Sequence, residues 1–236
     1  MAMDITAIQR ALKKSGFDPG KIDGVWGRRT IAAVKAFQEA HGLEVDGILG
    51  PETARALTGD AKAPAAGAAD IATPLVWLEE ALSLVGTEEK RGKESNEKII
   101  AWARRCNIDY KSDDIPWCGL FVAHCIGATL PEEPMPTTPL LARSWRKFGS
   151  ACQPVQGAVL VFWRGSKDGT TGHVGFYRSE DDESFHVLGG NQSDSVNTCR
   201  IGKDRLLAAR WPRTAASLHG AKVQAKGVGK LSHNEA

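Results

Sequence analysis

The chain has 236 residues, of which 42% are hydrophobic and 25% are charged, and these proportions are typical of a globular protein. Its 30 Lys and Arg residues against 28 Asp and Glu residues give a formal net charge of +2, so neither nucleic acid nor a membrane surface is expected as a partner. No apolar run approaches the ~20 residues that a membrane-spanning helix needs.

The start of the chain, MAMDITAIQRALKKSG, lacks the basic segment and the apolar core of a secretory signal. We therefore expect synthesis in the cytoplasm without a signal peptide, where thiols stay reduced. The five cysteines, an odd number, fit a set of mostly free thiols better than a disulfide framework.

The first 60 residues contain an internal repeat. Residues 23–30, DGVWGRRT, are matched by residues 46–53, DGILGPET, at an offset of 46 − 23 = 23 residues. Each copy has an Asp-Gly turn, a second glycine and a helix start. Apolar spacings of three and four predict three helices: one capped by Asp4 and ended by Gly16, one capped by Thr30 and ended by Gly42, and one over residues 51–57. A small three-helix bundle over residues 1–60 follows.

The stretch GFDPGKIDGVWGRRTIAAVKAFQEAHGLEVDGILGPETARAL resembles the peptidoglycan-binding domain found beside cell-wall hydrolases. The resemblance extends from Asp4 to about Leu57 and implies that bacterial peptidoglycan is the partner of this bundle. Trp26 and Arg28, on the first Asp-Gly loop, are the candidate ligand contacts. The alternative is that the repeated glycines and aspartates only shape a compact bundle.

A change in composition separates this bundle from the rest of the chain. Residues 59–70, GDAKAPAAGAAD, are rich in Ala, Gly and Pro without apolar periodicity, which is typical of a tether. We place a flexible linker at residues 61–72, a larger domain at residues 73–214, and a flexible tail at residues 215–236.

The larger domain reads as helices followed by strands. Helices are predicted from Thr73-Pro74 to Gly86, from Ser95 to Cys106, from Cys118 to about Ile126, and after Thr138-Pro139. Short β-rich runs separated by Gly, Ser and Asp predict strands at 157–163, 173–178, 184–190, 195–201 and 206–211. This order predicts an α+β fold with helices packed on an antiparallel sheet.

The stretch DIPWCGLFVAHC contains the candidate nucleophile, Cys118. A thiolate attacks more readily than a thiol, and a helix N-terminus or a nearby imidazole lowers the cysteine pKa from ~8.5. Because Pro116 disfavours helix in the residue ahead of it, Cys118 is expected at the N-terminus of a helix, with its N–H available to an oxyanion. Cys125, seven residues later, is expected to pack in the core.

Among six histidines, His173 is the candidate base, because it begins a strand beside Gly172. His124 lies on the nucleophile helix and cannot readily turn back, and His186 is in mid-strand. A base also needs an acceptor on its other ring nitrogen. VLGGNQSD supplies Asn191 and Gln192, and adjacent strands would place Asn191 beside His173, 191 − 173 = 18 residues later. Alternatively, Asn191 is only a turn residue.

WCGLFVAHC, GHVGFY and VLGGNQSD together resemble the motifs of papain-like cell-wall hydrolases of the CHAP and NlpC types, over roughly residues 75–211. The resemblance implies a papain-like fold with Cys118 as nucleophile, His173 as base and Asn191 as third member. We also assign substrate contact to Trp117. Two positions depart from the pattern: Ala158 replaces a common aspartate, and Gly189 stands where CHAP relatives carry glutamate. Tyr110 is conceivable in the oxyanion hole.

These features predict a monomeric, phage-endolysin-like peptidoglycan hydrolase that cleaves an amide bond through an acyl-enzyme and acts on the wall after release. The alternatives are a secreted antibacterial effector of the same chemistry and a catalytically inactive wall-binding protein. No H-E-x-x-H and no C-x-x-C occurs, so neither a zinc enzyme nor a thiol redox protein is favoured, and no metal or cofactor is expected.

Overall fold

The computed structural model describes residues 5–22, 28–45, 47, 49, 51–59, 75–90, 92, 94–215, 222–225, 230–232 and 235. The chain divides into two compact units, residues 1–79 and 80–236, and each is described by itself. The division falls inside α4 (Val76–Ser83), whereas the predicted linker at residues 61–72 lies outside the described residues. No helix in the described part of the chain has the length and apolar character to cross a membrane.

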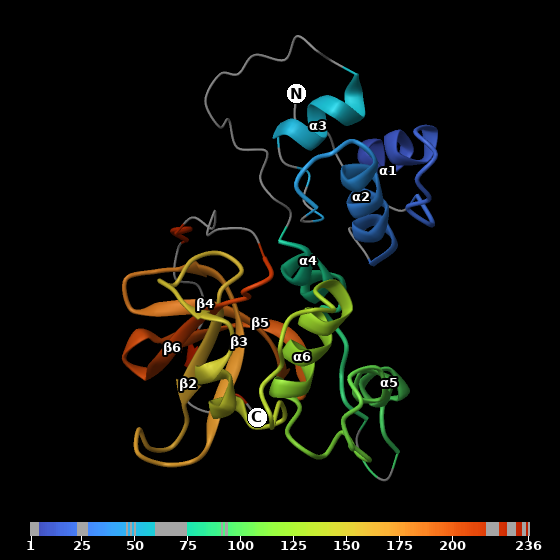
Figure 1. Cartoon of the computed structure of the whole chain (residues 1–236). Coiled ribbons are helices and arrows are strands. Elements are labelled where there is room, and N and C mark those ends of the chain that lie inside the picture. The colour runs from blue at the N-terminus through green and yellow to red at the C-terminus, as the bar shows by residue number, and fades with distance from the viewer. Residues whose placement is uncertain are drawn as a thin grey trace. The chain divides into compact units, whose positions relative to one another are not determined.

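The first unit contains three helices, α1 (Ile5–Lys14), α2 (Arg28–Ala40) and α3 (Pro51–Thr58), as the apolar spacing predicts (Figure 1). Their buried apolar side chains form its core: Ile8, Leu12, Ala33, Val34, Phe37, Leu49 and Leu57. Gly16 and Gly42 follow α1 and α2 with φ of 89° and 64°, a conformation that glycine adopts without steric cost.

The sequence repeat has a structural counterpart in two buried Gln–Thr hydrogen bonds. Gln9 Nε2 donates to Thr30 Oγ1 at 3.2 Å, and Gln38 Nε2 donates to Thr53 Oγ1 at 3.1 Å. The predicted capping role of Thr30 is wrong, because α2 begins two residues earlier, at Arg28. The repeated threonine instead pairs with a buried glutamine of another segment, which explains why a polar residue recurs on an inward position.

The second unit is α+β, as predicted, and its sheet has seven strands in the order β1-β6-β2-β3-β4-β5-β7. The pairs are antiparallel except β5 with β7, which is parallel, so the sheet is mixed. The strands are β1 (Ser150–Ala151), β2 (Val159–Trp163), β3 (Gly172–Glu180), β4 (Ser184–Gln192), β5 (Ser195–Gly202), β6 (Leu206–Trp211) and β7 (Leu231–Ser232). Beside them are α5 (Glu97–Arg105), α6 (Cys118–Thr129) and the 3-10 turns η1 (Ala142–Lys147) and η2 (Lys203–Arg205).

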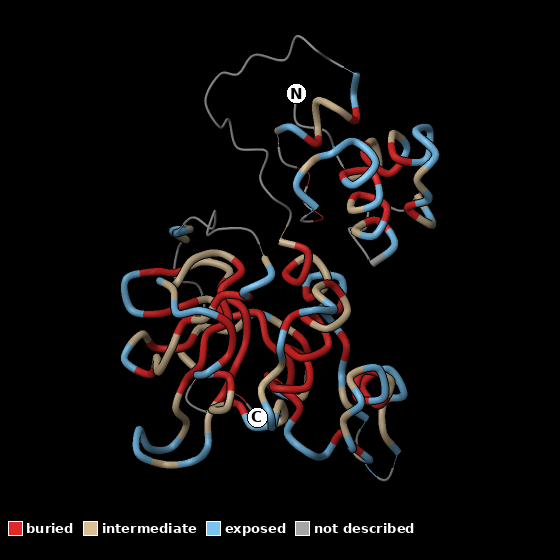
Figure 2. Tube along the Cα trace, in the orientation of Figure 1, coloured by how far each residue is buried: buried red, intermediate tan, exposed pale blue. Residues whose placement is uncertain are grey.

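The core of this unit lies between α6 and the central strands, where both are buried along most of their length (Figure 2). Phe121 of α6 meets Phe176 of β3 edge-on, with ring centroids 6.0 Å apart. Helix α6 is apolar on nearly every side, which is typical of a helix enclosed by protein. The sheet therefore holds the N-terminal end of α6 firmly in place.

Three helix predictions differ from the structure. Helix α5 begins after Asn96, whose Oδ1 accepts from Lys98 N as a cap, while the hydroxyl of Ser95, the predicted helix start, accepts from Asp113 N. The segment after Pro139 forms only η1, because Trp145 Nε1 bonds back to the Pro139 carbonyl. Helix α4 ends at Ser83 rather than at the predicted Gly86, and Leu82 and Val85 are 37% and 51% exposed.

Some described residues of the segment predicted as a flexible tail, residues 215–236, contact the sheet domain. Gln224 forms a bridge with Glu180, Leu231 and Ser232 pair with β5, and Glu235 is buried in an ion pair. The sequence pattern does not predict this packing. A two-residue strand is too short to show apolar periodicity, and a buried carboxylate paired with a distant arginine does not add to it.

Candidate active site

Cys118 is the first residue of α6, as its sequence context predicts. Its side chain is buried, with the residue 6% exposed. The preceding residue, Trp117, is held by a hydrogen bond from its backbone N to Asn191 Oδ1 at 3.1 Å. The N-terminal end of the helix is thereby tied to the end of β4. The first N–H groups of a helix have no partner within it, and those of Cys118 and Gly119 point toward the Cys118 sulfur, where an oxyanion would form.

The helix start lowers the Cys118 pKa as predicted, but burial outweighs this effect in the resting protein. Burial raises the pKa of the Cys118 thiol, although backbone N–H groups of Val174 and Gly119 and the charge of Arg164 act in the opposite direction. Burial prevails because a thiolate loses more solvation here than these groups return. Cys118 is therefore a neutral thiol until a base takes its proton.

His173 lies near the start of β3, opposite Phe162 of β2, and is only 1% exposed. Its Nε2 lies 2.9 Å from Gln192 Oε1. The Gln192 amide is oriented by its other end, because Gln192 Nε2 donates to the Asn197 carbonyl at 2.6 Å and to Asn197 Oδ1 at 3.0 Å. Gln192 Oε1 can only accept, so it fixes the His173 proton on Nε2 and leaves Nδ1 as the basic nitrogen.

The thiol and the imidazole are neighbours without being hydrogen-bonded. The Cys118 thiol lies beside the N–H of Val174, which belongs to the peptide bond that links it to His173. None of the hydrogen bonds of these two described residues joins the thiol to the ring. His173 Nδ1 must therefore approach the sulfur before a proton moves, and catalytic hydrogen bonds often tighten in this way when a substrate binds.

The two glycines of VLGGNQSD make room on opposite sides of β4. A Cβ on Gly189 would come within 3.0 Å of His173 Nε2 and 2.6 Å of Gln192 Oε1. A Cβ on Gly190 would come within 2.5 Å of the Trp117 ring. Successive residues of a strand point to opposite faces. Because Gly189 and Gly190 lack side chains, His173 and Gln192 pack closely against one face of β4, and the start of α6 packs against the other face.

The amide that hydrogen-bonds His173 is Gln192, whereas Asn191 Oδ1, the predicted partner, accepts from Trp117 N. Asn191 has φ of 56°, and the pairing register of β4 with β5 shifts between Gly189 and Gln192. This irregularity turns Asn191 toward the Trp117 N–H and Gln192 toward His173. The sequence contained both amides, but it did not reveal the left-handed residue that exchanges their roles.

Burial dominates the electrostatics of His173 and lowers its pKa to about 4. The charge of Glu235 and the bond to Gln192 act to raise that pKa, whereas Arg164 and Arg205 act to lower it. Sequence reasoning named Gln192 as a candidate acceptor but chose Asn191 over it, and it missed all three of these charged residues. The charged residues come from separate segments, and no local pattern marks them as neighbours of the site.

The predicted ligand contacts fare differently. Trp117, predicted as a substrate contact, is 0% exposed, and its Nε1 donates to Glu89 Oε2 at 3.0 Å. Trp26 lies outside the described residues, and Arg28 begins α2 but its side chain is not described. Tyr110 donates its hydroxyl to the Ile115 carbonyl at 2.7 Å, and burial raises the Tyr110 pKa.

The residues assigned to structure have structural partners. His124 Nε2 lies 3.2 Å from Glu80 Oε1 and its ring stacks on Trp102, and Cys125 is fully buried with a pKa that burial raises. Within the described ranges, no group of three or more His, Cys, Asp or Glu side chains is placed to hold a metal ion.

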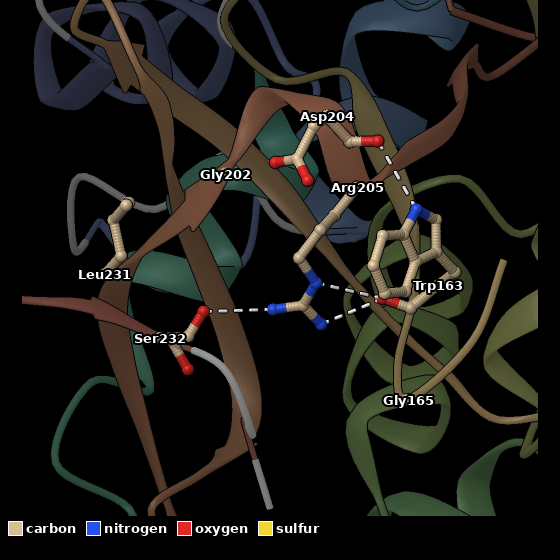
Figure 3. A pocket seen from close by; sticks show the side chains of 7 residues that line it. All are labelled: Trp163, Gly165, Gly202, Asp204, Arg205, Leu231 and Ser232. Carbon is tan, nitrogen blue, oxygen red and sulfur yellow. Dashed lines mark hydrogen bonds between the residues drawn. The ribbon is translucent and has the colours of Figure 1, made fainter.

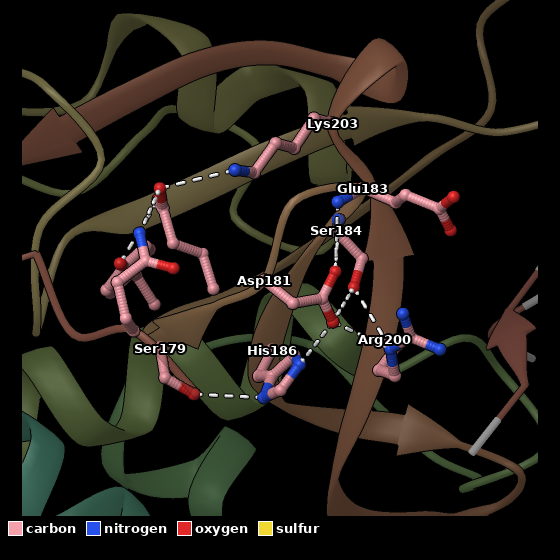
Figure 4. Close-up of polar contacts among 10 residues, drawn as sticks. Ser179, Asp181, Glu183, Ser184, His186, Arg200 and Lys203 are labelled. Carbon is pink, nitrogen blue, oxygen red and sulfur yellow. Dashed lines mark hydrogen bonds and ion pairs between the residues drawn. The ribbon is translucent and has the colours of Figure 1, made fainter. Parts of the chain in front are cut away.

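His186 belongs to a second polar cluster, at the far end of the β3–β4 ladder (Figure 4). Its Nδ1 lies 3.0 Å from Ser179 Oγ, and its Nε2 lies 2.8 Å from Asp181 Oδ2. Asp181 also accepts from Arg200 Nε at 2.9 Å and from two backbone N–H groups, and the Arg200 bond is the main reason that the Asp181 pKa is lowered. This carboxylate is committed to holding the hairpin, so the cluster reads as structural.

A pocket of about 270 Å³ lies beside the end of β2 (Figure 3). It is lined by Trp163, Gly165, Gly202, Asp204, Arg205, Leu231 and Ser232. Trp163 pairs with Gly172, the residue before His173, so the pocket adjoins the strand that carries the base. The Arg205 guanidinium lies 5.6 Å from the centre of the Trp163 ring.

Comparison with known proteins gives matches in the first unit. Residues 2–57 match the family described as "Putative peptidoglycan binding domain". The spore cortex-lytic enzyme of Bacillus cereus is 46% identical over 54 residues, which are 23% of this chain and 21% of that protein. The N-acetylmuramoyl-L-alanine amidase CwlM of Mycobacterium tuberculosis is 43% identical over 54 residues, or 23% of this chain and 13% of that protein. The spore cortex-lytic enzyme of Bacillus subtilis is 46% identical over 55 residues, or 23% and 18%.

The aligned segment therefore spans about a fifth or less of the curated relatives' own length. No solved structure matches the chain. The N-terminal unit carries a peptidoglycan-binding domain that is homologous to segments of cell-wall lytic proteins.

Proposed function

We propose that the chain is a peptidoglycan hydrolase that cleaves an amide bond of the wall peptide with Cys118 as nucleophile and His173 as base. The observation that carries this proposal is the buried, neutral imidazole of His173, oriented by Gln192 and adjacent to the first thiol of α6. The peptidoglycan-binding domain supplies the substrate class. Tethering of the second unit to bound wall raises the local concentration of the scissile bond.

The proposed reaction has two steps. His173 Nδ1 takes the proton of Cys118 as the sulfur attacks the amide carbonyl, and N–H groups at the start of α6 hold the oxyanion. The C–N bond then breaks, the imidazolium gives its proton to the leaving amine, and a thioester remains on Cys118. Water, deprotonated by His173, attacks the thioester and releases a carboxylic acid and the free thiol. In each step Gln192 keeps the ring oriented.

A second candidate function is that of a wall-binding protein without hydrolytic activity. The raised Cys118 pKa and the lack of a thiol–imidazole hydrogen bond in these described residues favour it. Both candidates predict binding to the wall, and only the first predicts soluble fragments. The relatives are similar to this chain only within the binding segment. They therefore support a wall substrate but not a particular catalytic mechanism.

Digestion of purified peptidoglycan by the full chain, with mass spectrometry of the released fragments, separates the two candidates and identifies the bond that is cut. We expect fragments with a new amine and a new carboxylate. Cys118→Ala should release none while it still cosediments with peptidoglycan, and Cys125→Ala is the matched control on the same helix. Fragments from Cys118→Ala at the wild-type rate would contradict the cysteine mechanism.

A further inference from the structure

The segment that carries Leu231, Ser232 and Glu235 is bound to the sheet close to the base. Leu231 and Ser232 form β7, which pairs with Arg200 and Ile201 of β5. Glu235 is 1% exposed, and both of its carboxylate oxygens contact Arg205, at 2.6 and 2.9 Å. A carboxylate is buried only where its charge is compensated, and this two-point contact is the strong form of that pair.

Arg205 connects this segment to the strand next to His173. Its Nε and Nη2 donate to the Trp163 carbonyl at 3.1 and 2.9 Å, and its Nη1 donates to the Ser232 carbonyl at 3.0 Å (Figure 3). Together with the two bonds to Glu235, all five guanidinium N–H groups have partners. Arg205 is therefore a fixed link between the end of β2, Ser232 and Glu235.

The backbone of Glu235 reaches the turn that carries the orienting glutamine. The Glu235 carbonyl accepts from Ser193 N at 3.1 Å, and Ser193 directly follows Gln192. Ser193 and Asp194 have φ of 49° and 62°, a conformation that non-glycine residues rarely adopt. An irregular turn of this kind needs outside contacts to keep one shape. The Glu235 carbonyl supplies such a contact one residue from Gln192.

The charge of Glu235 also acts on the ring. Of the charged groups around His173, Glu235 favours the imidazolium, whereas Arg164 and Arg205 oppose it, and the effect of Glu235 exceeds that of either arginine. The Cys118 thiol is neutral in the resting protein and adds no charge. Burial opposes ionisation of Glu235, but the bonds from Arg205 and the nearby His173 lower its pKa overall, so it is ionised at neutral pH.

We propose that Glu235 is a positioning residue of the active site: through Ser193 it holds the turn that carries Gln192, and its carboxylate stabilises the imidazolium formed when His173 takes the Cys118 proton. This inference rests on the proposed function. It assigns a role in the catalytic unit to a segment that sequence analysis treats as a tail.

The test is the rate at which iodoacetamide alkylates Cys118 in the full chain, read by mass spectrometry of the Cys118 peptide between pH 5 and 8. The Cys118 thiolate with His173 imidazolium and the neutral thiol with neutral imidazole contain the same number of protons. The fraction of reactive thiolate, and with it the alkylation rate, is therefore constant with pH in this range if the two groups share a proton. We expect the alkylation rate of Glu235→Gln to be independent of pH as well, but about tenfold lower than that of wild type, because one nearby opposite charge that stabilises the imidazolium is lost.

Controls separate this role from a structural one. Glu235→Asp, which keeps the charge, should recover most of the rate, and Glu132→Gln, an exposed glutamate, should match wild type. If Glu235→Gln fails to fold because Arg205 is left unpaired, Glu235→Gln with Arg205→Gln replaces the ion pair by two neutral amides and should still fall below wild type.

The outcomes distinguish this inference from the proposed function. A wild-type alkylation rate that changes with pH throughout pH 5 to 8 would overturn the cysteine mechanism itself. If the pH-independent alkylation rate of Glu235→Gln, or of the double variant, equals that of wild type, only the role of Glu235 is overturned.

Discussion

His173 of β3 and His186 of the neighbouring strand β4 have partners of opposite character. His173 is paired with a neutral amide that leaves Nδ1 free to accept a proton, whereas His186 has a carboxylate on Nε2 and a hydroxyl on Nδ1. The carboxylate of Asp181 is shared with Arg200 and the hairpin backbone. The difference teaches that hydrogen-bond partners, rather than residue type, distinguish a candidate base from a structural histidine.

Removing each histidine is the strongest way to break this comparison. His173→Ala should lower amide hydrolysis by about 10³-fold or more, because the thiol loses its base. His186→Asn should leave the rate within about threefold, because the cluster that it belongs to lies at the far end of the β3–β4 ladder. Rates of fragment release from peptidoglycan measure both, and equal losses in the two variants would contradict the contrast.

The Asp181 cluster should instead appear in stability. Asp181→Ala leaves Arg200 and two backbone N–H groups without their acceptor, and we expect a loss of about 3 kcal/mol in the free energy of unfolding. Denaturant titration measures this value, with Asp182→Ala, an exposed neighbour, as the control. A change below about 0.5 kcal/mol would show that the cluster does not hold the hairpin.

His173 should make folding stability depend on pH in a defined range. Its folded pKa of about 4 is below the unfolded value of 6.5, so the unfolded chain binds more protons between these values. The associated stability is fully present above pH 6.5 and is lost as the pH falls toward 4, by roughly 3 kcal/mol in all. Unfolding free energies of wild type and His173→Gln should converge over this range, and a constant difference would contradict the burial of a neutral ring.

Gln192→Glu makes the His173 site resemble the His186 site. A carboxylate beside Nε2 stabilises the imidazolium, so the acid limb of kcat/KM should move upward by about one to two pH units. Gln192→Ala should lower kcat without this shift, because it removes orientation but adds no charge. An unchanged acid limb in Gln192→Glu would show that residue 192 does not control the protonation of His173.

The smallest effect is expected at Cys125. This thiol is fully buried on the same helix as Cys118, and it has a packing role. Cys125→Ala should cost about 1 kcal/mol of stability and leave hydrolysis unchanged within twofold. A loss of hydrolysis comparable to that of Cys118→Ala would mean that the assignment of the two cysteines is incomplete.

Much of the fold is predictable from local patterns. The three N-terminal helices follow from apolar spacing, and the five longer strands follow from β-rich runs between Gly, Ser and Asp clusters. Cys118 at the start of α6 is likewise local, because Pro116 and the apolar run that follows define the helix start.

The parts that could not be predicted depend on contacts between distant segments. Gln192 rather than Asn191 hydrogen-bonds the His173 ring because Asn191 has a left-handed backbone conformation, which the sequence pattern does not reveal. The raised Cys118 pKa results from burial beneath the sheet, which outweighs the helix terminus. Glu235 reaches Arg205 across 30 residues of sequence, and a short polar segment gives no periodic signal for that contact.

The most direct test of the central claim compares the pH dependence of Cys118 alkylation in the wild-type chain and in His173→Gln. We predict a rate in the wild type that is constant from pH 5 to 8, since the proton only moves within the Cys118–His173 pair. In His173→Gln the rate should fall about tenfold for each pH unit below the thiol pKa, as for an isolated cysteine. A wild-type rate that falls with the same slope would show that the two groups do not share a proton, and the proposed catalytic pair would be wrong.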